Sequence, residues 1–159
     1  MKSILLLAAL PEEADAFRPG ESCLVEGEPV PVRIVETDGT RIKIVTCGLG
    51  KVNAALAVGR YASSETTLVA MTGTCGRIGP IKGDCFWIAK AVQHDYGARQ
   101  VDGFVHYRAG DWPMGEARDH AFTAIPDPGL GLPHAAIASG DVFLECPATA
   151  EALAERLGT

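Results

Sequence analysis

The segment LVAMTGTCGRIGPIKGD, residues 68–84, constrains the fold more than any other part of this sequence. An apolar run, Val69 to Met71, leads directly into a turn that is bounded by Gly73 and Gly76 and filled with small polar side chains. We predict a strand buried on both faces, followed by a turn whose glycines let backbone amides approach a bound molecule. In open α/β sheets, ligand sites lie beyond the carboxyl ends of strands. The segment therefore predicts an α/β fold with a ligand-binding turn at one sheet edge.

The size and composition of the chain predict one globular domain over residues 1–159. Hydrophobic residues make up 47% of the sequence and charged residues 21%, which is typical of a folded protein with one core. The formal net charge is -6, and no run of Lys or Arg occurs. This balance argues against nucleic acid or an anionic membrane surface as the partner and favours a small neutral ligand.

The five cysteines predict reduced thiols in a cytoplasmic protein, since they are odd in number, scattered, and include no C-x-x-C pair. The apolar run from Ile4 to Leu10 is shorter than a membrane span. It is followed by Pro11-Glu12-Glu13 instead of the small residues of a signal-peptide cleavage site. We therefore interpret this run as a first strand of a soluble protein.

Local patterns predict an alternation of strands and helices along most of the chain. Asp38-Gly39 indicates a tight hairpin turn between two antiparallel strands. The predicted strands cover residues 4–9, 24–26, 30–36, 41–46, 68–71, 84–92 and 135–138, and the predicted helices cover residues 11–17, 51–62 and 147–157. Residues 94–133 are the least regular part. Such a loop is either a functional lid or partner contact, or a plain surface excursion.

Glu12 and Glu13 follow directly on the first predicted strand, so at least one carboxylate should lie at the same sheet edge as the turn 72–76. That edge is where a ligand would bind. The alternative is that both carboxylates only interact with the dipole of the helix that begins at Pro11.

A second small polar turn, Ser139-Gly140-Asp141, follows the strand predicted for residues 135–138, and Phe143 beyond it offers a flat ring for stacking. The alternative for Phe143 is a core aromatic. The adjacent residues His94 and Asp95 suggest a catalytic dyad or a metal site. Neighbouring strand positions face opposite ways, however, so we expect the pair not to act on one atom. Without His-x-x-x-His or Cys-rich spacing, we predict no metal site.

Two common catalytic patterns are missing from the sequence. The turn Gly48 to Lys51 does not complete the G-x-x-x-x-G-K-[ST] pattern of a triphosphate-binding loop. No G-x-S-x-G elbow of a serine hydrolase occurs either.

The segments LAALPEEADAF, CGLGKVNAAL, MTGTCGRIGPIKGD, QHD and IASGDVF resemble, in order and spacing, the methylthioadenosine/S-adenosylhomocysteine nucleosidases of the purine nucleoside phosphorylase superfamily. The resemblance covers nearly the whole chain. It implies an α/β fold with a mixed, partly closed central sheet flanked by helices, and cleavage of the N-glycosidic bond between adenine and a 5'-thio-substituted ribose. It also implies a cytoplasmic homodimer of methionine salvage that needs no cofactor.

Site roles follow from the resemblance residue by residue. Glu13 resembles the family's acid/base glutamate, which activates the attacking water, and a carboxylate can also favour the positive charge of an oxocarbenium-like sugar. Substrate contacts are implied for Leu10, Leu49, Thr74, Cys75, Gly76, Phe143 and Leu144. Thr74 stands where the family has serine, which keeps the hydroxyl. Phe143 should stack on the purine base, and the backbone of Leu144 should form hydrogen bonds with the edge of that base. Phe104 and Pro113 resemble loop residues that the family's dimer donates to the partner's 5' pocket.

Further family motifs, a Met-Glu-Met-Glu-like segment that holds the ribose and a Ser-Asp segment that protonates the purine, lie beyond the position of Thr159. We therefore expect the fold to be incomplete at its C-terminus relative to the family. Two other functions remain open: a phosphorolytic nucleoside phosphorylase, or a non-catalytic nucleoside-binding or dimerisation module. The segment Leu10 to Glu13 disfavours phosphorolysis, because it lacks the phosphorylases' Gly-Asp-Pro and arginine arrangement and its carboxylate would repel phosphate.

Overall fold

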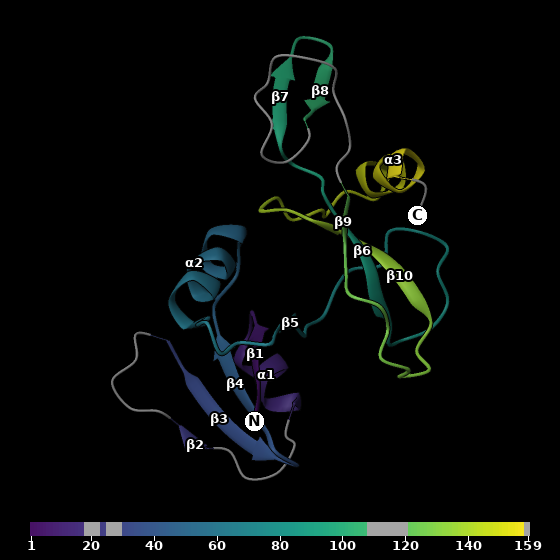
Figure 1. The fold of residues 1–159 in the computed structure, drawn as a ribbon. Helices are drawn as coiled ribbons and strands as arrows, with labels where there is room; N and C mark the ends of the chain where they lie inside the picture. The colour runs from purple at the N-terminus through teal and green to yellow at the C-terminus, as the bar shows by residue number, and fades with distance from the viewer. Residues whose placement is uncertain (18–22, 25–29, 108–120, 158–159) are drawn as a thin grey trace. The chain divides into compact units, whose positions relative to one another are not determined.

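The structure is a computed structural model that describes residues 1–17, 23–24, 30–107 and 121–157. Its chain forms two compact units, Met1–Cys75 and Gly76–Thr159, and each is described by itself. Both units combine mixed sheets with helices (Figure 1). The predicted α/β class with mixed sheets is therefore confirmed.

The first unit is built on a five-stranded sheet with the order β2-β3-β4-β1-β5. Its elements are β1 (Lys2–Ala8), α1 (Pro11–Ala16), β2 (Cys23–Leu24), β3 (Val32–Thr37), β4 (Thr40–Thr46), α2 (Lys51–Tyr61) and β5 (Leu68–Met71). Strand β1 runs parallel to β4 on one side and to β5 on the other, while β3 and β4 form the antiparallel hairpin that Asp38-Gly39 predicts. Asp38 and Gly39 have positive φ values of 46° and 72°, as a tight hairpin turn requires.

Alternate residues of β1 enter two different cores, because successive side chains of a strand face opposite ways. Leu5 and Leu7 pack in one cluster with Ala57 and Tyr61 of α2. Leu6 and Ala8 pack in the other cluster, which includes Ala14 of α1. The central strand is thus covered on one face by α2 and on the other by α1, which is why Leu5 and Leu7 are 1% and 4% exposed.

Strand β5 differs from its prediction, although its bounds agree with it. Val69 and Met71 are 45% and 62% exposed, so the expectation of a strand buried on both faces is wrong. The physical reason is position: β5 is the last strand in the order of this sheet, as far as the described residues go. An apolar sequence alone does not distinguish a central strand from one at the edge.

The second unit holds a three-stranded sheet of order β10-β6-β9 and a separate hairpin, β7-β8. The bounds are β6 (Trp87–Gln93), β7 (Gly97–Gln100), β8 (Gly103–His106), β9 (Ala121–Thr123), β10 (His134–Ser139) and α3 (Pro147–Leu157). Strands β6 and β10 are parallel, and β6 and β9 are antiparallel. Asp127 accepts hydrogen bonds from the backbone N–H groups of Gly129 and Leu130 and pairs with His134 at 3.0 Å, which fixes the turn before β10.

The hairpin β7-β8 was not predicted, because residues 94–133 read as a long loop. Its turn carries Asp102-Gly103, the same dipeptide that revealed the hairpin of β3 and β4. The signal was therefore present in the sequence.

Candidate active site

The candidate site of the first unit lies where β1 and β5 end side by side. The two strands are parallel neighbours with Leu7 opposite Met71, and the backbone N–H of Thr72 donates to the Leu7 carbonyl oxygen at 2.9 Å. Parallel strands present their carboxyl ends at one edge of the sheet. The segment after β1, which begins helix α1, therefore meets the turn after β5, as the sequence predicted.

Glu13 is the residue on which these segments converge. Its Oε2 accepts hydrogen bonds from the backbone N–H groups of Ala9 and Leu10, each at 3.0 Å. Its Oε1 accepts from the backbone N–H of Thr74 at 2.7 Å and from the Thr74 hydroxyl at 2.8 Å. The carboxylate thus joins the end of β1 to the turn after β5, across 61 residues of sequence.

Gly73 makes this approach possible. A Cβ atom at this position would lie 3.1 Å from Oε1 of Glu13 and 3.3 Å from its Oε2. Contacts that short are tighter than ordinary van der Waals packing. A side chain at position 73 would therefore require the carboxylate to shift by a few tenths of an ångström, and glycine removes that need.

The hydrogen bonds keep Glu13 ionised. Burial acts to raise the pKa of this carboxyl, but the donors from Thr74, Leu10 and Ala9 outweigh it and lower the pKa below its ordinary value of 4.5. Nearby, burial raises the pKa of the Cys47 thiol, and the negative charge of Glu13 raises it further. At neutral pH the site therefore combines a fixed carboxylate with a neutral thiol.

The segments that follow β1, β4 and β5 hold four further predicted substrate contacts, Leu10, Leu49, Cys75 and Gly76. Leu10 precedes α1 and is 37% exposed, and Leu49 lies in the turn before α2 and is 69% exposed. Cys75 is an exposed free thiol, and a Cβ on Gly76 would meet nothing within 4 Å. The structure brings Thr74 and the Leu10 backbone into contact with Glu13, and it leaves the side chains of Leu10 and Leu49 open to solvent.

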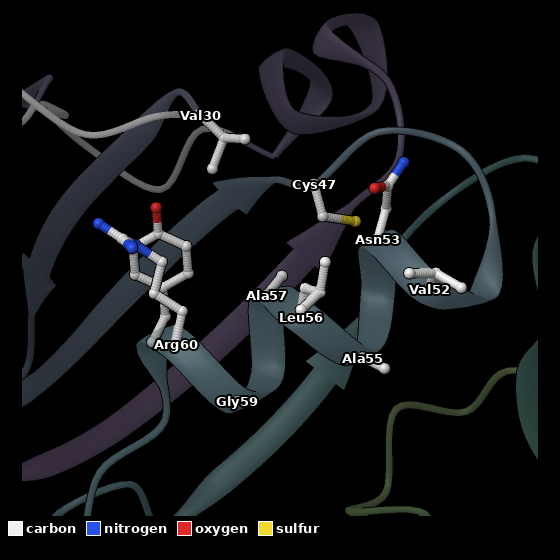
Figure 2. Close-up of a pocket in the computed structure, with 10 residues that line it drawn as sticks. Val30, Cys47, Val52, Asn53, Ala55, Leu56, Ala57, Gly59 and Arg60 are labelled. Atoms are coloured by element: carbon white, nitrogen blue, oxygen red, sulfur yellow. The ribbon is translucent and has the colours of Figure 1, made fainter.

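A hollow runs along α2 in the same unit (Figure 2). Cys47 at the end of β4 forms one wall, and Val52 and Leu56 of α2 line it as well. Its further lining residues are Val30, Asn53, Ala55, Ala57, Gly59, Arg60 and Tyr61. The sequence patterns did not single out this hollow, whose lining is mostly apolar.

In the second unit, Phe143 and Leu144 lie in the connection between β10 and α3. Phe143 is 87% exposed, so it is not the core aromatic that was the alternative. Its ring is free to stack on a ligand, while its role in binding stays a prediction.

The expectation for His94-Asp95 is wrong. A Cβ on Gly140 would overlap His94 Nε2 and lie 2.8 Å from Asp95 Oδ2, so both side chains reach one point of the Ser139-Gly140-Asp141 turn. Strand β6 ends at Gln93, and the alternation of a strand does not continue beyond its end. The pair therefore acts on the same backbone segment.

Of the two residues predicted to contribute to a partner's 5' pocket, the structure describes only Phe104. Phe104 lies in β8, is 38% exposed and packs edge-on against His106 with ring centroids 4.5 Å apart. Pro113 lies outside the described residues. Nothing in the structure tests the role of either residue.

Within residues 1–17, 23–24, 30–107 and 121–157, no three His, Cys, Asp or Glu side chains group in a way that could hold a metal ion. Over the same ranges, no helix is both long enough and apolar enough to cross a bilayer.

Comparisons with known proteins agree with the resemblance seen in the sequence. Futalosine hydrolase from Thermus thermophilus is 31% identical over 149 residues, which cover 87% of this chain and 65% of that protein. The chain therefore spans less than two thirds of the length of this relative.

Solved structures of low sequence identity share the fold. A 5'-methylthioadenosine/S-adenosylhomocysteine nucleosidase from S. pneumoniae, determined with a transition-state inhibitor, matches with a TM-score of 0.71 and 20% identity over 98% of this chain and 72% of that one. A futalosine hydrolase mutant of Helicobacter pylori matches with a TM-score of 0.72 and 17% identity over 99% of this chain and 77% of that one. The nucleoside phosphorylase-like fold is thus confirmed.

The sequence profile of the phosphorylase superfamily matches residues 3–159. This match includes the ends of β1 and β5, Glu13 and the turn after β10. The chain belongs to the phosphorylase superfamily.

Proposed function

We propose that the protein is a nucleosidase that hydrolyses the N-glycosidic bond of 5'-thio-substituted adenosines, namely methylthioadenosine and S-adenosylhomocysteine. The observation that carries the proposal is the Glu13 carboxylate, kept ionised between the end of β1 and Thr74. The similarity to nucleosidases supports the reaction class.

In this mechanism Glu13 is the general base that takes a proton from the attacking water. An ionised carboxylate has about four acceptor positions, and protein donors use four: two from the backbone after β1 and two from Thr74. Water must therefore share or replace one of them. The Thr74 hydroxyl is the donor that can rotate away, whereas backbone N–H groups are fixed. The negative charge of Glu13 then also stabilises a positively charged sugar in the transition state.

The substrate contacts remain those that the resemblance implies. Leu10 and Leu49 would contact the sugar, Cys75 and Gly76 would line the purine and ribose floor, and Phe143 and the Leu144 backbone would hold the base. The exposed Phe143 ring supports the last of these roles. The reaction consumes one water: the water oxygen bonds to the sugar carbon as the bond to adenine breaks, and Glu13 takes the proton of the water. The departing adenine takes up a proton, a role that the resemblance assigns to the family's Ser-Asp segment. No step calls for a cofactor, so the proposal includes none.

Futalosine is a second candidate substrate, because the curated relative with 31% identity is named as a futalosine hydrolase. Phe104 and Pro113, as the proposed contacts to the 5' substituent, would contribute to discrimination between the candidates. Free-base release from methylthioadenosine, S-adenosylhomocysteine and futalosine, compared at equal concentrations, distinguishes the two candidates.

Phosphorolysis is the alternative reaction. Glu13 disfavours it, because an ionised carboxylate repels a phosphate anion brought to the same place. Measuring base release with and without added phosphate decides this point. Release that does not depend on phosphate supports hydrolysis, and release that requires phosphate contradicts it.

The catalytic role of Glu13 is tested by the substitution Glu13→Gln, which keeps size and removes the base. Loss of a general base lowers the rate by about 100-fold to 10,000-fold. Glu12→Gln is the matched control, since Glu12 is the exposed neighbour on the same helix turn. Equal rates for the two variants would reject the assignment. Nucleoside binding without base release in the unsubstituted protein would instead indicate a non-catalytic binding module.

We also propose that the protein is a homodimer in the cytoplasm and takes part in methionine salvage. The exposed apolar side chains of Leu49, Val52 and Leu56 support self-association. Cys47, Cys75, Cys85 and Cys146 are free thiols, which a reducing compartment maintains.

A further inference from the structure

We propose that His94 and Asp95 are positioning residues: together they form a seat that fixes the turn 139–141 and so orients Phe143. We call them the His94–Asp95 seat. The consequence for ligand binding rests on the proposed function, in which the Phe143 ring stacks on the base. The fixing of the turn itself does not rest on it.

The seat holds the turn at both of its ends. Before Gly140, the backbone N–H of His94 donates to the Ser139 carbonyl oxygen at 3.0 Å. After Gly140, the backbone N–H of Asp141 donates to Asp95 Oδ2 at 2.6 Å. A bond from an N–H to an ionised carboxylate is among the stronger hydrogen bonds in proteins. The turn therefore has one tether on each side of its glycine.

The glycine of the turn lies directly against the seat. A Cβ at position 140 would overlap His94 Nε2 and would lie 2.8 Å from both Cγ and Oδ2 of Asp95. Gly140 is not among the glycines with positive φ, so space and not backbone conformation requires glycine here. The imidazole and the carboxylate thus form a surface shaped to the bare backbone of the turn.

His94 is buried where it lies against the turn. It is 9% exposed. Burying a polar ring has a cost unless the ring is well bonded, so its place in the packing is specific. On the other side of the Asp95 carboxylate, Gln93 Nε2 makes a long contact of 3.5 Å with Oδ1.

The orientation of Phe143 depends on the His94–Asp95 seat, because few packing contacts hold the Phe143 side chain. Its side chain is 87% exposed, and that of Val142 is 59% exposed. Residues 140–146 form neither helix nor strand between β10 and α3. The Asp141 N–H bond to Asp95 is two residues before Phe143, so losing this tether frees the ring to sample other directions.

The test measures order in the turn first, without any ligand. We would record backbone ¹⁵N relaxation at Val142, Phe143 and Leu144, and the chemical shift of the Asp141 amide proton, in the full chain. Asp95→Ala should lower the order of these residues and remove the downfield shift expected of an N–H that donates to a carboxylate. Asp95→Asn keeps an acceptor oxygen and should restore most of the order.

Two controls separate the seat from general effects of substitution. Asp102→Ala removes an exposed carboxylate from the turn of β7 and β8 in the same unit. Gly140→Ala should disturb the turn by overlap, whereas Gly59→Ala adds a methyl group that meets nothing within 4 Å. Far-UV circular dichroism shows that each variant is folded. If Asp95→Ala does not fold, Asp95→Asn and Gly140→Ala carry the test.

Binding of adenine and methylthioadenosine, measured by calorimetry, then tests the consequence for the ligand. We expect about tenfold weaker binding for Asp95→Ala and Gly140→Ala, as losing a charged hydrogen bond implies. Unchanged order at residues 142–144 overturns the proposal, and so does a loss of order that leaves adenine binding unaltered. If the unsubstituted protein binds neither probe, the proposed function fails, while the relaxation data still decide whether the seat fixes the turn.

Discussion

At the scale of single residues, the site depends on how one carboxylate is held. Strand patterns placed at least one carboxylate, from Glu12 or Glu13, at the edge of the polar turn 72–76. The choice of Glu13 and the role of Thr74 came from the family resemblance. The four hydrogen bonds of Glu13 could not be predicted from the sequence, since they need the two strands to be parallel neighbours. Gly73 was only partly predictable. Its lack of a Cβ suggested that another group approaches the backbone closely, and the structure shows that this group is the Glu13 carboxylate.

Removing the Thr74 hydroxyl should raise the pKa of Glu13. Thr74→Val keeps shape and the backbone donor but deletes the side-chain bond of 2.8 Å to Oε1, one of the interactions that lower this pKa. A ¹³C titration of the Glu13 carboxyl by NMR measures the change. Thr72→Val, two residues earlier, should leave the titration where it is. An unchanged pKa in Thr74→Val would show that the hydroxyl contributes nothing.

The lowered pKa of Glu13 in the unsubstituted protein makes the free energy of unfolding depend on pH. Because the pKa of Glu13 is lower in the folded protein than its ordinary 4.5, its stabilising contribution is complete above that ordinary value. The contribution is lost as the pH falls through the folded pKa. Glu13→Gln should therefore reduce the acid dependence of stability in this range, as acid titrations followed by circular dichroism will show.

Gly73→Ala should destabilise the fold by about 1 kcal/mol, the lower end of the cost of overpacking. The added methyl group would lie 3.1 Å from Oε1 of Glu13, and the carboxylate cannot move away without losing its own hydrogen bonds. Urea unfolding should show a lower midpoint at an unchanged slope. Gly76→Ala is the matched control, since its Cβ meets nothing within 4 Å. Equal midpoints for the two variants would contradict the close approach.

At the scale of helices and strands, sequence pattern located most elements of both units. Period-two and helical patterns depend on neighbours along the chain, so they located α2, β5 and α3 to within one residue and β1 to within two residues. Two features depend instead on the fold around them. These are the exposure of β5 and the convergence of His94 and Asp95 on Gly140 just beyond the end of β6. The hairpin β7-β8 is a different case, because its turn signal was present in the sequence and was missed.

Helix α3 gives a prediction about thiol reactivity. Cys146 directly precedes this helix, and hydrogen bonds from the Thr149 side chain, the Thr149 backbone and the Ala148 backbone lower its pKa. A lower pKa increases the thiolate fraction near neutral pH. Cys146 should therefore react with iodoacetamide faster than Cys75 and Cys85, which are also exposed. Peptide mass spectrometry measures the rates.

The control for this prediction removes the first of these bonds. Thr149→Val should slow alkylation of Cys146 and leave the rates of the other exposed cysteines as they are. Cys47 should be slowest, because it is 6% exposed and its pKa is raised by burial. Equal rates for Cys146 and Cys85 would contradict the effect of the helix end.

At the scale of the whole molecule, the superfamily match and the fold agree with each other. The function is a proposal that rests on both. The superfamily match extends over residues 3–159, and it includes both compact units. The candidate base and its turn lie in the first unit, whereas Phe143 and its seat lie in the second. The prediction of one domain stays a prediction, and so does the joint action of the two sets of residues on one nucleoside.

Self-association should depend on one face of α2 and its preceding turn. Leu49, Val52 and Leu56 are 69%, 68% and 65% exposed. Val52 and Leu56 are four residues apart in α2 and so lie on one side of this helix, and Leu49 lies in the turn before it. Fully burying such a side chain is favourable by about 1.5–3 kcal/mol, and a second copy of the chain would cover all three at once. Leu56→Glu puts a charge in that contact, where burial is costly. It should therefore shift the protein toward monomer in sedimentation velocity.

Val101→Glu is the matched control for this variant. Val101 is fully exposed in the turn of β7 and β8, so the same substitution there changes surface charge equally but leaves the α2 face intact. It should sediment like the unsubstituted protein. An equal shift for both variants would assign the effect to net charge, and an unsubstituted protein that stays monomeric at all concentrations would reject the homodimer.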